Sequence, residues 1–244
     1  MKTDEIAILA GGLATRLKPV TETIPKSLIE VAGKPFIYHQ LKLLHNKGIR
    51  KAVICAGYLG EQIKDYVRDG AEFGIQTEYS FDGNKLLGTG GAIKNSLKFF
   101  KDNFFILYGD SYLDAEFELI NEYFLKSNKF GLMTVLKNEG KWDKSNIEFE
   151  NGEILVYDKK ISSVKMDYID YGLGILSKDA FKDFENREVF DLEEVYKHLL
   201  KNKQLAGFEV RERFYEIGSF SGLEETENYL INKNNAIGNN ELHR

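Results

Sequence analysis

The sequence predicts an α/β protein in which helices cover a central, mostly parallel sheet. Short apolar runs alternate with amphipathic segments over the first half, and Pro35 and Gly48 stand where one such segment is expected to begin and end as a helix. Strands joined by helices of this length form right-handed crossovers between parallel strands. The predicted strands are Glu5–Leu9, Lys51–Ala56, Gln76–Ser80 and Asn103–Tyr108, and the predicted helices are Pro35–Lys47, Leu59–Arg68 and Gly90–Phe100.

The pattern changes after Asp110, where strand signals become more frequent. Asn151 and Gly152, in "NIEFENGEILVYDKK", form the dipeptide that favours a two-residue hairpin turn. No linker rich in Pro, Ser or Gly divides the halves, so we predict a single domain over residues 1–244, with a polar tail at 231–244 that is expected to fray. The remaining predicted elements are the helices Phe117–Lys126, Ser177–Phe184, Leu192–Lys201 and Leu223–Lys233 and the strands Phe130–Lys137, Tyr168–Leu176, "QLAGFEV" and "FYEIG".

The composition limits the function classes. The 244 residues are 43% hydrophobic and 29% charged with a net charge of −5, which is typical of soluble globular proteins and argues against a nucleic-acid partner. The single cysteine, Cys55, rules out an intramolecular disulfide and is expected to pack in the apolar run "KAVICAG". No apolar stretch approaches the ~20 residues of a membrane helix, and the N-terminus does not resemble a signal sequence, so we expect no membrane partner and a cytoplasmic location.

A glycine-rich segment, "AGGLATR", directly follows the first predicted strand. In an open parallel sheet, ligands bind outside the carboxyl ends of the strands. Glycines let backbone N–H groups approach an anion closely, Arg16 can hold phosphate oxygens in bidentate fashion, and Lys26 adds a compact positive charge. The glycines alone are also compatible with a plain turn, but this combination favours a phosphate site. It is not a P-loop, because the G-x-x-x-x-G-K-[ST] pattern is missing.

The segment "LAGGLATRLKPVTETIPKSLIEVAGKPF" resembles the signature of the sugar-1-phosphate nucleotidyltransferases, and the resemblance continues through "LGTGGAI", "YGD" and "YEIGSF". Ala14 departs from it, since the family usually has glycine there. The resemblance implies a Rossmann-like three-layer sandwich with a mixed, mostly parallel sheet and a smaller β-rich sugar-binding lobe. It also implies that residues 1–115 mainly bind nucleotide and residues 116–230 mainly bind the sugar phosphate. Within the family, Leu87–Ile93 is most similar to the branch that transfers GMP from GTP to D-glycero-D-manno-heptose 1-phosphate.

The resemblance implies a nucleotide site in two parts. The first part is the strand end and glycine-rich segment with its basic residues, and the second is a loop that closes over the base and ribose. Thr89 in this loop is alternatively a helix cap, and Asp82 just before it can accept hydrogen bonds from a base edge. The implied nucleotide-binding residues are Leu9, Ala10, Gly11, Gly12, Leu13, Ala14, Thr15, Arg16, Lys26, Asp82, Gly88, Thr89 and Gly90.

Two carboxylates are candidate ligands for Mg²⁺, the expected cofactor. Asp110 ends the apolar strand in "FFILYGDS", where a carboxylate points into the cleft, although it can also serve as a helix or turn cap. Beside a triphosphate, Mg²⁺ is commonly held by one or two carboxylates and by phosphate oxygens. The family pairs such an aspartate with a second acid late in the chain, and here Glu216 in "FYEIGSF" stands where many relatives have aspartate.

The sugar-phosphate side is implied by weaker matches. Lys159 or Lys160, in "VYDKK", stands where relatives carry a lysine that reaches the sugar phosphate, and both are alternatively solvated hairpin charges. Asp170 and Gly172, in "DYIDYGLGILSKD", match a segment that meets sugar hydroxyls, although Asp170 is also compatible with a turn. Tyr108 and Gly109, at the end of the strand before Asp110, complete the expected sugar-phosphate site.

Together these residues predict an in-line attack of a sugar 1-phosphate on the α-phosphorus of a nucleoside triphosphate, with release of pyrophosphate. Arg16, Lys26 and Asp110 are the expected catalytic residues, and the product is expected to be a nucleotide-sugar precursor of cell-surface polysaccharide. The alternatives are a uridylyl-, cytidylyl- or thymidylyltransferase for a hexose 1-phosphate, a glycosyltransferase that uses a nucleotide sugar, and a non-catalytic nucleotide-binding module. The protein is expected to be a monomer or a homodimer.

Overall fold

The computed structural model describes residues 2–12, 15–142, 144–161 and 163–241. A large mixed sheet runs through the molecule in the order β12-β8-β11-β6-β1-β4-β5, and the hairpin β9–β10 extends it beside β11. The strands of this sheet are β1 (Glu5–Ala10), β4 (Lys51–Ala56), β5 (Gln76–Phe81), β6 (Asn103–Tyr108), β8 (Gly131–Lys137), β9 (Ile147–Glu150), β10 (Glu153–Tyr157), β11 (Tyr168–Ser177) and β12 (Leu205–Val210).

The first half of the chain builds the parallel part of the sheet, as the sequence predicts. β1 pairs in parallel with both β4 and β6, and β4 pairs in parallel with β5. Parallel strands are buried on both faces, which explains why these segments read as continuous apolar runs. The carboxyl ends of β1, β4, β5 and β6 therefore meet at one edge of the sheet, directly before the glycine-rich segment and Asp110.

The second half adds the mixed part. β11 runs antiparallel to β6 on one side and to β8 on the other, and β12 runs parallel to β8. The predicted hairpin is confirmed as β9–β10, and Asn151 and Gly152 have φ values of 52° and 83°. Positive φ at both central residues is the conformation that favours an Asn-Gly turn.

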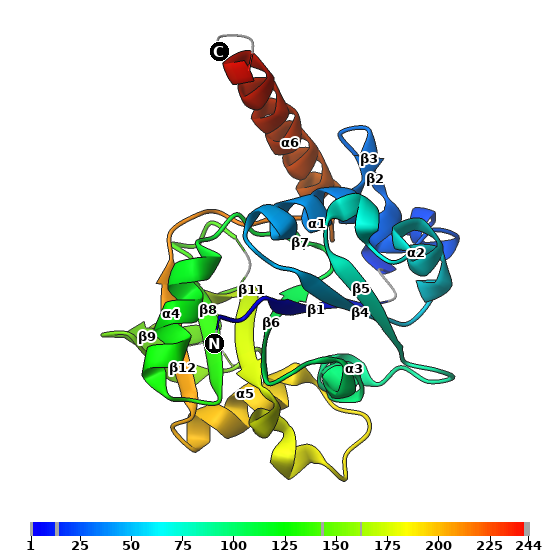
Figure 1. Cartoon of the computed structure of the whole chain (residues 1–244). Coiled ribbons are helices and arrows are strands. Elements are labelled where there is room, and N and C mark those ends of the chain that lie inside the picture. The colour runs from blue at the N-terminus through cyan, green and yellow to red at the C-terminus, as the bar shows by residue number, and fades with distance from the viewer. Residues whose placement is uncertain (1, 13–14, 143, 162, 242–244) are drawn as a thin grey trace.

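Helices cover both faces of the sheet (Figure 1). The helices α1 (Phe36–Asn46), α2 (Gly60–Val67) and α4 (Phe117–Ser127) pack on one face, whereas α3 (Gly88–Ser96) and α5 (Leu192–Lys201) pack on the other. Successive side chains of β1 alternate between these layers, because Ile6 and Ile8 join the first core and Ala7 joins the second. The prediction of a three-layer α/β sandwich is confirmed.

The last helix is longer than its sequence pattern predicts. α6 spans Phe220–Glu241 and not Leu223–Lys233, so the segment predicted to fray is largely helical. Leu223, Tyr229 and Leu230 pack with α1 and the small strands β2 (Glu30–Val31), β7 (Ser111–Tyr112) and β13 (Tyr215–Glu216), while the end of α6 extends away from the body (Figure 1). These contacts hold the first part of α6 against the body of the molecule.

Smaller differences from the predicted elements occur at helix ends. α3 begins at Gly88 and not at Gly90, and it ends in a 3₁₀ turn over Leu97–Phe99. The helix predicted over Ser177–Phe184 is a 3₁₀ helix that spans Lys178–Phe184. Pro35 ends the short strand β3 (Lys34–Pro35) and caps α1, and Gly48 follows α1 with a φ of 89°, as the helix-stop prediction requires.

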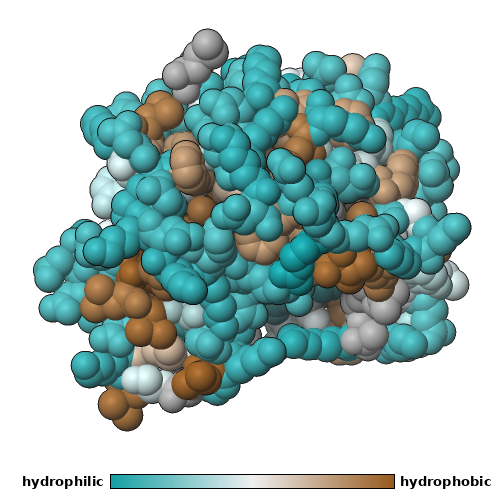
Figure 2. Space-filling model, turned by 90° about the horizontal axis from the view of Figure 1, so that it is seen from below, coloured by the Kyte–Doolittle hydropathy of each residue, from teal (hydrophilic) through white to brown (hydrophobic). Residues whose placement is uncertain are grey.

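The face of the molecule seen in Figure 2 is mostly hydrophilic, and its hydrophobic residues form small separate patches. Among the described residues, no helix combines the length and the apolar character that crossing a membrane requires.

Candidate active site

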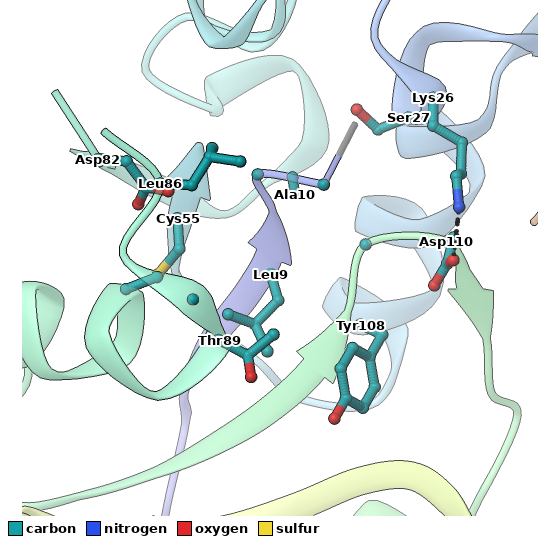
Figure 3. A pocket seen from close by; sticks show the side chains of 15 residues that line it. Leu9, Ala10, Lys26, Ser27, Cys55, Asp82, Leu86, Thr89, Tyr108 and Asp110 are labelled. Atoms are coloured by element: carbon teal, nitrogen blue, oxygen red, sulfur yellow. Dashed lines mark hydrogen bonds and ion pairs between the residues drawn. The ribbon is translucent and has the colours of Figure 1, made fainter. Parts of the chain in front are cut away.

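A cavity of about 250 Å³ lies at the carboxyl ends of the parallel strands (Figure 3). Asp82, Leu86 and Cys55 lie at one end of this first cavity, and Lys26 and Asp110 lie at the other. Its walls come from the ends of β1, β4, β5 and β6 and from α3. The lining residues are Leu9, Ala10, Gly11, Gly12, Lys26, Ser27, Cys55, Asp82, Leu86, Gly88, Thr89, Ala92, Tyr108, Gly109 and Asp110.

Glycines allow the strand ends to approach one another at this cavity. A Cβ added at Gly11 would lie 3.2 Å from the backbone nitrogen of Gly57, and one added at Gly109 would lie 2.8 Å from the carbonyl oxygen of Leu9. The Gly109 N–H donates to that same oxygen at 2.9 Å. A side chain at Gly109 would push the ends of β1 and β6 apart, whereas one at Gly11 would be tight against the Gly57 backbone.

Lys26 and Asp110 form an ion pair at one end of the first cavity. Lys26 opens a 3₁₀ turn, Lys26–Leu28, after Pro25, and Asp110 follows β6 by two residues. The Lys26 ammonium donates to Asp110 Oδ2 at 2.8 Å, and the two side chains are 21% and 33% exposed. The pair therefore places an ammonium and a carboxylate side by side in a partly desolvated position, where each charge acts strongly on a bound anion or cation.

Asp82 lies at the opposite end of the first cavity, after β5. Its Oδ2 accepts a hydrogen bond from the Leu87 N–H at 3.3 Å, and burial raises the pKa of its carboxyl. The surrounding wall is largely apolar, with Leu86, Cys55 and Ala92 nearby in the lining. Such a wall with a single carboxylate suits a flat heterocycle whose edge carries N–H donors.

The glycine-rich entry of α3 is anchored on α5. Thr89 Oγ1 donates to Asp191 Oδ1 at 3.2 Å and accepts from the Leu192 N–H at 2.9 Å, while the Gly90 N–H donates to the carbonyl of Phe190 at 3.0 Å. The alternative that Thr89 caps its own helix is therefore wrong, because α3 has no side-chain N-cap. Gly88 and Thr89 line the first cavity, whereas Gly90 packs on Phe190.

This close packing makes Gly91 sensitive to substitution. A Cβ at Gly91 would lie 2.3 Å from the carbonyl oxygen of Glu188, so Gly91→Ala must displace backbone. We expect Gly91→Ala to lower the free energy of unfolding by about 1–3 kcal/mol, as overpacking does. Denaturant unfolding of the two proteins measures this difference. Gly12→Ala is a suitable control, since no described atom lies within 4 Å of its Cβ position, and equal losses in both variants would contradict the packing argument.

A second cavity, of about 740 Å³, adjoins the first and shares Tyr108 and Asp110 with it. Segments far apart in the sequence line this second cavity: the end of β6, the β8–β9 connection, the loop after β10, β11, β13 and the start of α6. Its lining residues are Arg16, Tyr108, Asp110, Ser111, Lys141, Trp142, Lys144, Asn146, Lys159, Ile169, Asp170, Tyr171, Gly172, Arg213, Phe214, Tyr215, Glu216, Ser219, Ser221, Gly222 and Glu225.

Asp170 is held in place by the surrounding strands. Its Oδ2 accepts from the Tyr157 hydroxyl at 3.3 Å, its Oδ1 accepts from the Gly172 N–H at 3.0 Å, and its own N–H donates to Asn146 Oδ1 at 3.1 Å. Gly172 has a φ of 89° where the register between β11 and β8 shifts. The sequence alternative of a simple turn residue does not apply, because Asp170 lies within β11.

The structure separates the two neighbouring lysines. Lys159 lines the second cavity, and its ammonium lies 5.8 Å from the centroid of the Tyr108 ring. Lys160 is exposed outside this lining, and its N–H donates to Asp158 Oδ1 at 2.7 Å.

Burial, aided by the Asp170 carboxylate, raises the pKa of Tyr108 well above its usual value, so this phenol stays neutral between the two cavities.

Glu216 lies close to Asp110 but faces its own loop. Its carboxylate accepts from the Gly218 N–H and from the Ser219 hydroxyl, the latter at 2.7 Å. A Cβ added at Gly218 would lie 2.5 Å from Glu216 Oε2 and 3.5 Å from Asp110 Oδ2, so both carboxylates border one small space. The backbone enforces this proximity, because the Ile217 N–H donates to the Asp110 carbonyl at 3.0 Å.

The structure brings most of the predicted site residues to these two cavities. Arg16, predicted to bind nucleotide, lines the second cavity and not the first, and Gly109, predicted to bind the sugar phosphate, lines the first and not the second. Leu13 and Ala14 lie outside the described residues, and so does the side chain of Thr15. The residues that the sequence did not indicate include Ser27 and Ala92 in the first cavity and Trp142, Arg213 and Glu225 in the second.

The sequence matches the profile of the nucleotidyl transferase family over residues 6–232. The chain belongs to the nucleotidyl transferase family. It is 33% identical over 229 residues to D-glycero-alpha-D-manno-heptose 1-phosphate guanylyltransferase of Campylobacter jejuni, covering 92% of this chain and 98% of that protein. It is also 30% identical to a UTP–glucose-1-phosphate uridylyltransferase of Synechocystis, over 76% of this chain and 52% of that protein.

Solved structures of similar proteins share the fold of this nucleotidyl transferase. A putative glucose-1-phosphate thymidylyltransferase from Bacillus anthracis superposes with a TM-score of 0.83 at 21% identity, covering 92% of this chain and 94% of that chain. HddC from Yersinia pseudotuberculosis, complexed with GMP-PN, superposes with a TM-score of 0.74 at 25% identity, covering 94% and 100% of the two chains.

Proposed function

We propose that the protein condenses GTP with D-glycero-D-manno-heptose 1-phosphate to give GDP-heptose and pyrophosphate. The observation that carries this proposal is the junction of two cavities at Tyr108 and Asp110. Transfer of a nucleotidyl group needs a nucleoside triphosphate and a phosphorylated acceptor held so that the acceptor oxygen meets the α-phosphorus. Two adjoining cavities with a lysine–aspartate pair at their border provide this arrangement.

Asp82 supports guanine as the base. The Watson–Crick edge of guanine presents N1–H and a 2-amino group, two neighbouring donors that a carboxylate can accept together. Asp82 lies at the end of the first cavity remote from Lys26, which leaves the glycine-rich segment between them for the proposed triphosphate. Uracil, thymine and cytosine do not offer this pair of donors. The similarity to the Campylobacter heptose 1-phosphate guanylyltransferase, over nearly all of that protein, supports both the base and the sugar.

The proposed mechanism requires alignment and charge neutralisation. The phosphate oxygen of the sugar 1-phosphate is already anionic near neutral pH, so it attacks the α-phosphorus without a general base, and the bond from that phosphorus to the pyrophosphate oxygen breaks. Lys26 offsets the repulsion between the two anions and the charge that develops in the transition state. The backbone of Gly11 and Gly12 is proposed to hold the departing pyrophosphate, and Arg16, which lines the second cavity, is proposed to reach it from that side.

Mg²⁺ is the proposed cofactor, and Asp110 and Glu216 are its proposed protein ligands. Their carboxylates border one space beside Lys26 and supply the oxygen donors that this hard cation prefers. In the described part of the chain, no group of three or more His, Cys, Asp or Glu residues is arranged as a complete metal site. Phosphate oxygens of the substrates are therefore proposed to complete the coordination. When bound, the ion would neutralise phosphate charge and polarise the α-phosphoryl group.

A pyrophosphate-release assay tests the function. The protein is incubated with Mg²⁺, with each of GTP, UTP, CTP, ATP and dTTP, and with heptose, mannose and glucose 1-phosphates. We expect release with GTP and the heptose 1-phosphate to exceed that with every other pair. A preference for UTP, CTP or dTTP with a hexose 1-phosphate would replace the proposed substrates, and nucleotide binding without release for any pair would indicate a binding module.

Asp82→Asn tests the base assignment. An amide turned toward guanine cannot accept both donors and loses a charge-assisted hydrogen bond of about 1.5–3 kcal/mol. We therefore expect the ratio of kcat/KM for GTP to that for UTP to fall by about 10- to 100-fold. Asp65→Asn, on the exposed side of α2, is the matched control. An unchanged ratio in Asp82→Asn would remove Asp82 from base recognition.

A further inference from the structure

The wall of the second cavity contributed by Arg213 contains an ordered cation–aromatic cluster. The Arg213 guanidinium carbon lies 4.2 Å from the centroid of the Trp142 ring and 4.7 Å from that of Tyr215. Arg213 Nη2 also donates to Glu225 Oε2 on α6. All four residues line the second cavity. The guanidinium is thus fixed in orientation by two rings and one carboxylate, and little side-chain entropy remains to be lost on binding a ligand.

Further aromatic contacts and a backbone anchor hold this cluster. The Trp142 and Phe214 rings meet edge to face at 5.7 Å, and Phe214 meets Tyr171 in the same way at 6.2 Å. The Trp142 N–H donates to Asn138 Oδ1 at 3.0 Å, which fixes the connection between β8 and β9 that carries the indole. The cluster is therefore a rigid platform with an apolar ring and a charged pair on one wall.

Two polar groups of this wall are buried and lack a hydrogen-bond partner in the described part of the chain. They are Arg213 Nε and the hydroxyl of Tyr171, a residue that is only 2% exposed. A guanidinium has five N–H donors, and the described hydrogen bonds of the Arg213 side chain use only the Glu225 contact. Both atoms are covered by neighbouring groups, so the donors that a ligand can reach are the other guanidinium N–H groups of Arg213, whose side chain is 36% exposed.

The cluster is close to the proposed reaction site without being part of it. Arg213 precedes Glu216 by three residues, which span at most about 10 Å of extended chain. β13, which contains Tyr215 and Glu216, pairs with β7, which follows directly after Asp110. A sugar ring whose phosphate lies near Asp110 and Lys159 can thus extend a substituent toward Arg213.

We infer that Trp142, Arg213 and Glu225 form a subsite for the hydroxylated side chain that a heptose carries beyond its pyranose ring. This inference rests on the proposed function and names the part of the sugar that the enzyme discriminates. The neighbouring hydroxyls at C6 and C7 can accept from Arg213 and donate to Glu225, while the indole covers their C–H groups. A hexose, which has one exocyclic carbon, lacks the C7 hydroxyl, and sites built to bond a substrate hydroxyl discriminate strongly against analogues that lack it.

The test compares D-glycero-D-manno-heptose 1-phosphate with mannose 1-phosphate, which has the same ring configuration without the seventh carbon. Pyrophosphate release with GTP gives kcat/KM for each sugar in the wild type, in Arg213→Met and in Trp142→Leu. We expect the heptose-to-mannose ratio of kcat/KM to fall by about 10- to 100-fold in Arg213→Met, through KM for the heptose, with a smaller fall in Trp142→Leu. Arg211→Met, an exposed arginine two residues away, is the matched control and should keep the wild-type ratio.

The outcomes separate the subsite from the proposed function. If the wild type prefers the heptose and Arg213→Met reduces kcat/KM for both sugars equally, the cluster only secures α6 and the subsite is wrong, while the proposed function stands. If the wild type does not prefer the heptose, the proposed substrate and the subsite both fall. Thermal unfolding of each variant identifies one that fails to fold, and in that case Arg213→Lys, which keeps the charge but loses the planar donor geometry, must show the same fall in the ratio.

Discussion

Lys26→Met is expected to lower kcat for nucleotidyl transfer by about 100- to 1000-fold, because it removes a positive charge aimed at the charge that develops in the transition state. Lys26 lines the first cavity, and its ammonium lies 2.8 Å from Oδ2 of Asp110, which lines both cavities. Methionine keeps much of the length and apolar volume of the lysine stem, so the loss reports on the ammonium. Steady-state pyrophosphate release at saturating GTP and sugar 1-phosphate measures the effect.

The control for this experiment is Lys126→Met. Lys126 is 79% exposed and lies 3.7 Å from Glu122 on α4, so it has the same charge and a carboxylate neighbour away from the site. We expect its kcat to match that of the wild type, since surface ion pairs contribute little. A Lys26→Met protein that is folded and turns over within threefold of the wild-type rate would show that Lys26 is not catalytic.

Asp110→Asn is expected to lower kcat by a similar factor and to raise the Mg²⁺ concentration needed for half-maximal rate. Asparagine keeps the shape of aspartate but is a neutral and weaker ligand for a hard cation. The same change also leaves the Lys26 ammonium without its carboxylate neighbour at 2.8 Å. A Mg²⁺ titration of the rate separates the two effects, because only loss of a ligand shifts the titration midpoint.

Asp179→Asn provides a matched control for Asp110→Asn. Asp179 pairs with Lys182 at 3.0 Å, and its side chain is 43% exposed, so its substitution removes an aspartate–lysine pair outside both cavities. A lower kcat for Asp110→Asn with an unchanged Mg²⁺ midpoint would assign Asp110 to the orientation of Lys26 and not to the metal. An unchanged kcat would remove it from the mechanism.

The fold was largely predictable from the sequence because its parallel half follows simple rules. β1, β4 and β6 are buried on both faces and appear as apolar runs, and the glycine after α1 marks its end. The two-residue strands β2, β3 and β7 are too short to show alternation. The end of α6 is rich in asparagine, so its composition predicts a polar tail, whereas the helix continues to Glu241.

The site was predictable to the extent that its residues are close together in the sequence. The end of β1 and the segment around Asp110 each carry several cavity residues within one short motif. Trp142, Arg213 and Glu225 come from a strand connection, the approach to β13 and α6, and no local pattern joins them. The pairing of β13 with β7 brings the segment of Arg213 close to Asp110, although the two are far apart in the sequence.

The most direct test of the central claim is the stoichiometry of the products formed from GTP and D-glycero-D-manno-heptose 1-phosphate with Mg²⁺. Mass spectrometry quantifies the nucleotide sugar, and an enzymatic assay quantifies pyrophosphate in the same sample. Two adjoining cavities that align both substrates predict equal amounts of GDP-heptose and pyrophosphate, and no pyrophosphate when either substrate is omitted. Pyrophosphate or phosphate released from GTP without the sugar, or a nucleotide consumed without a nucleotide sugar, would contradict the proposed reaction.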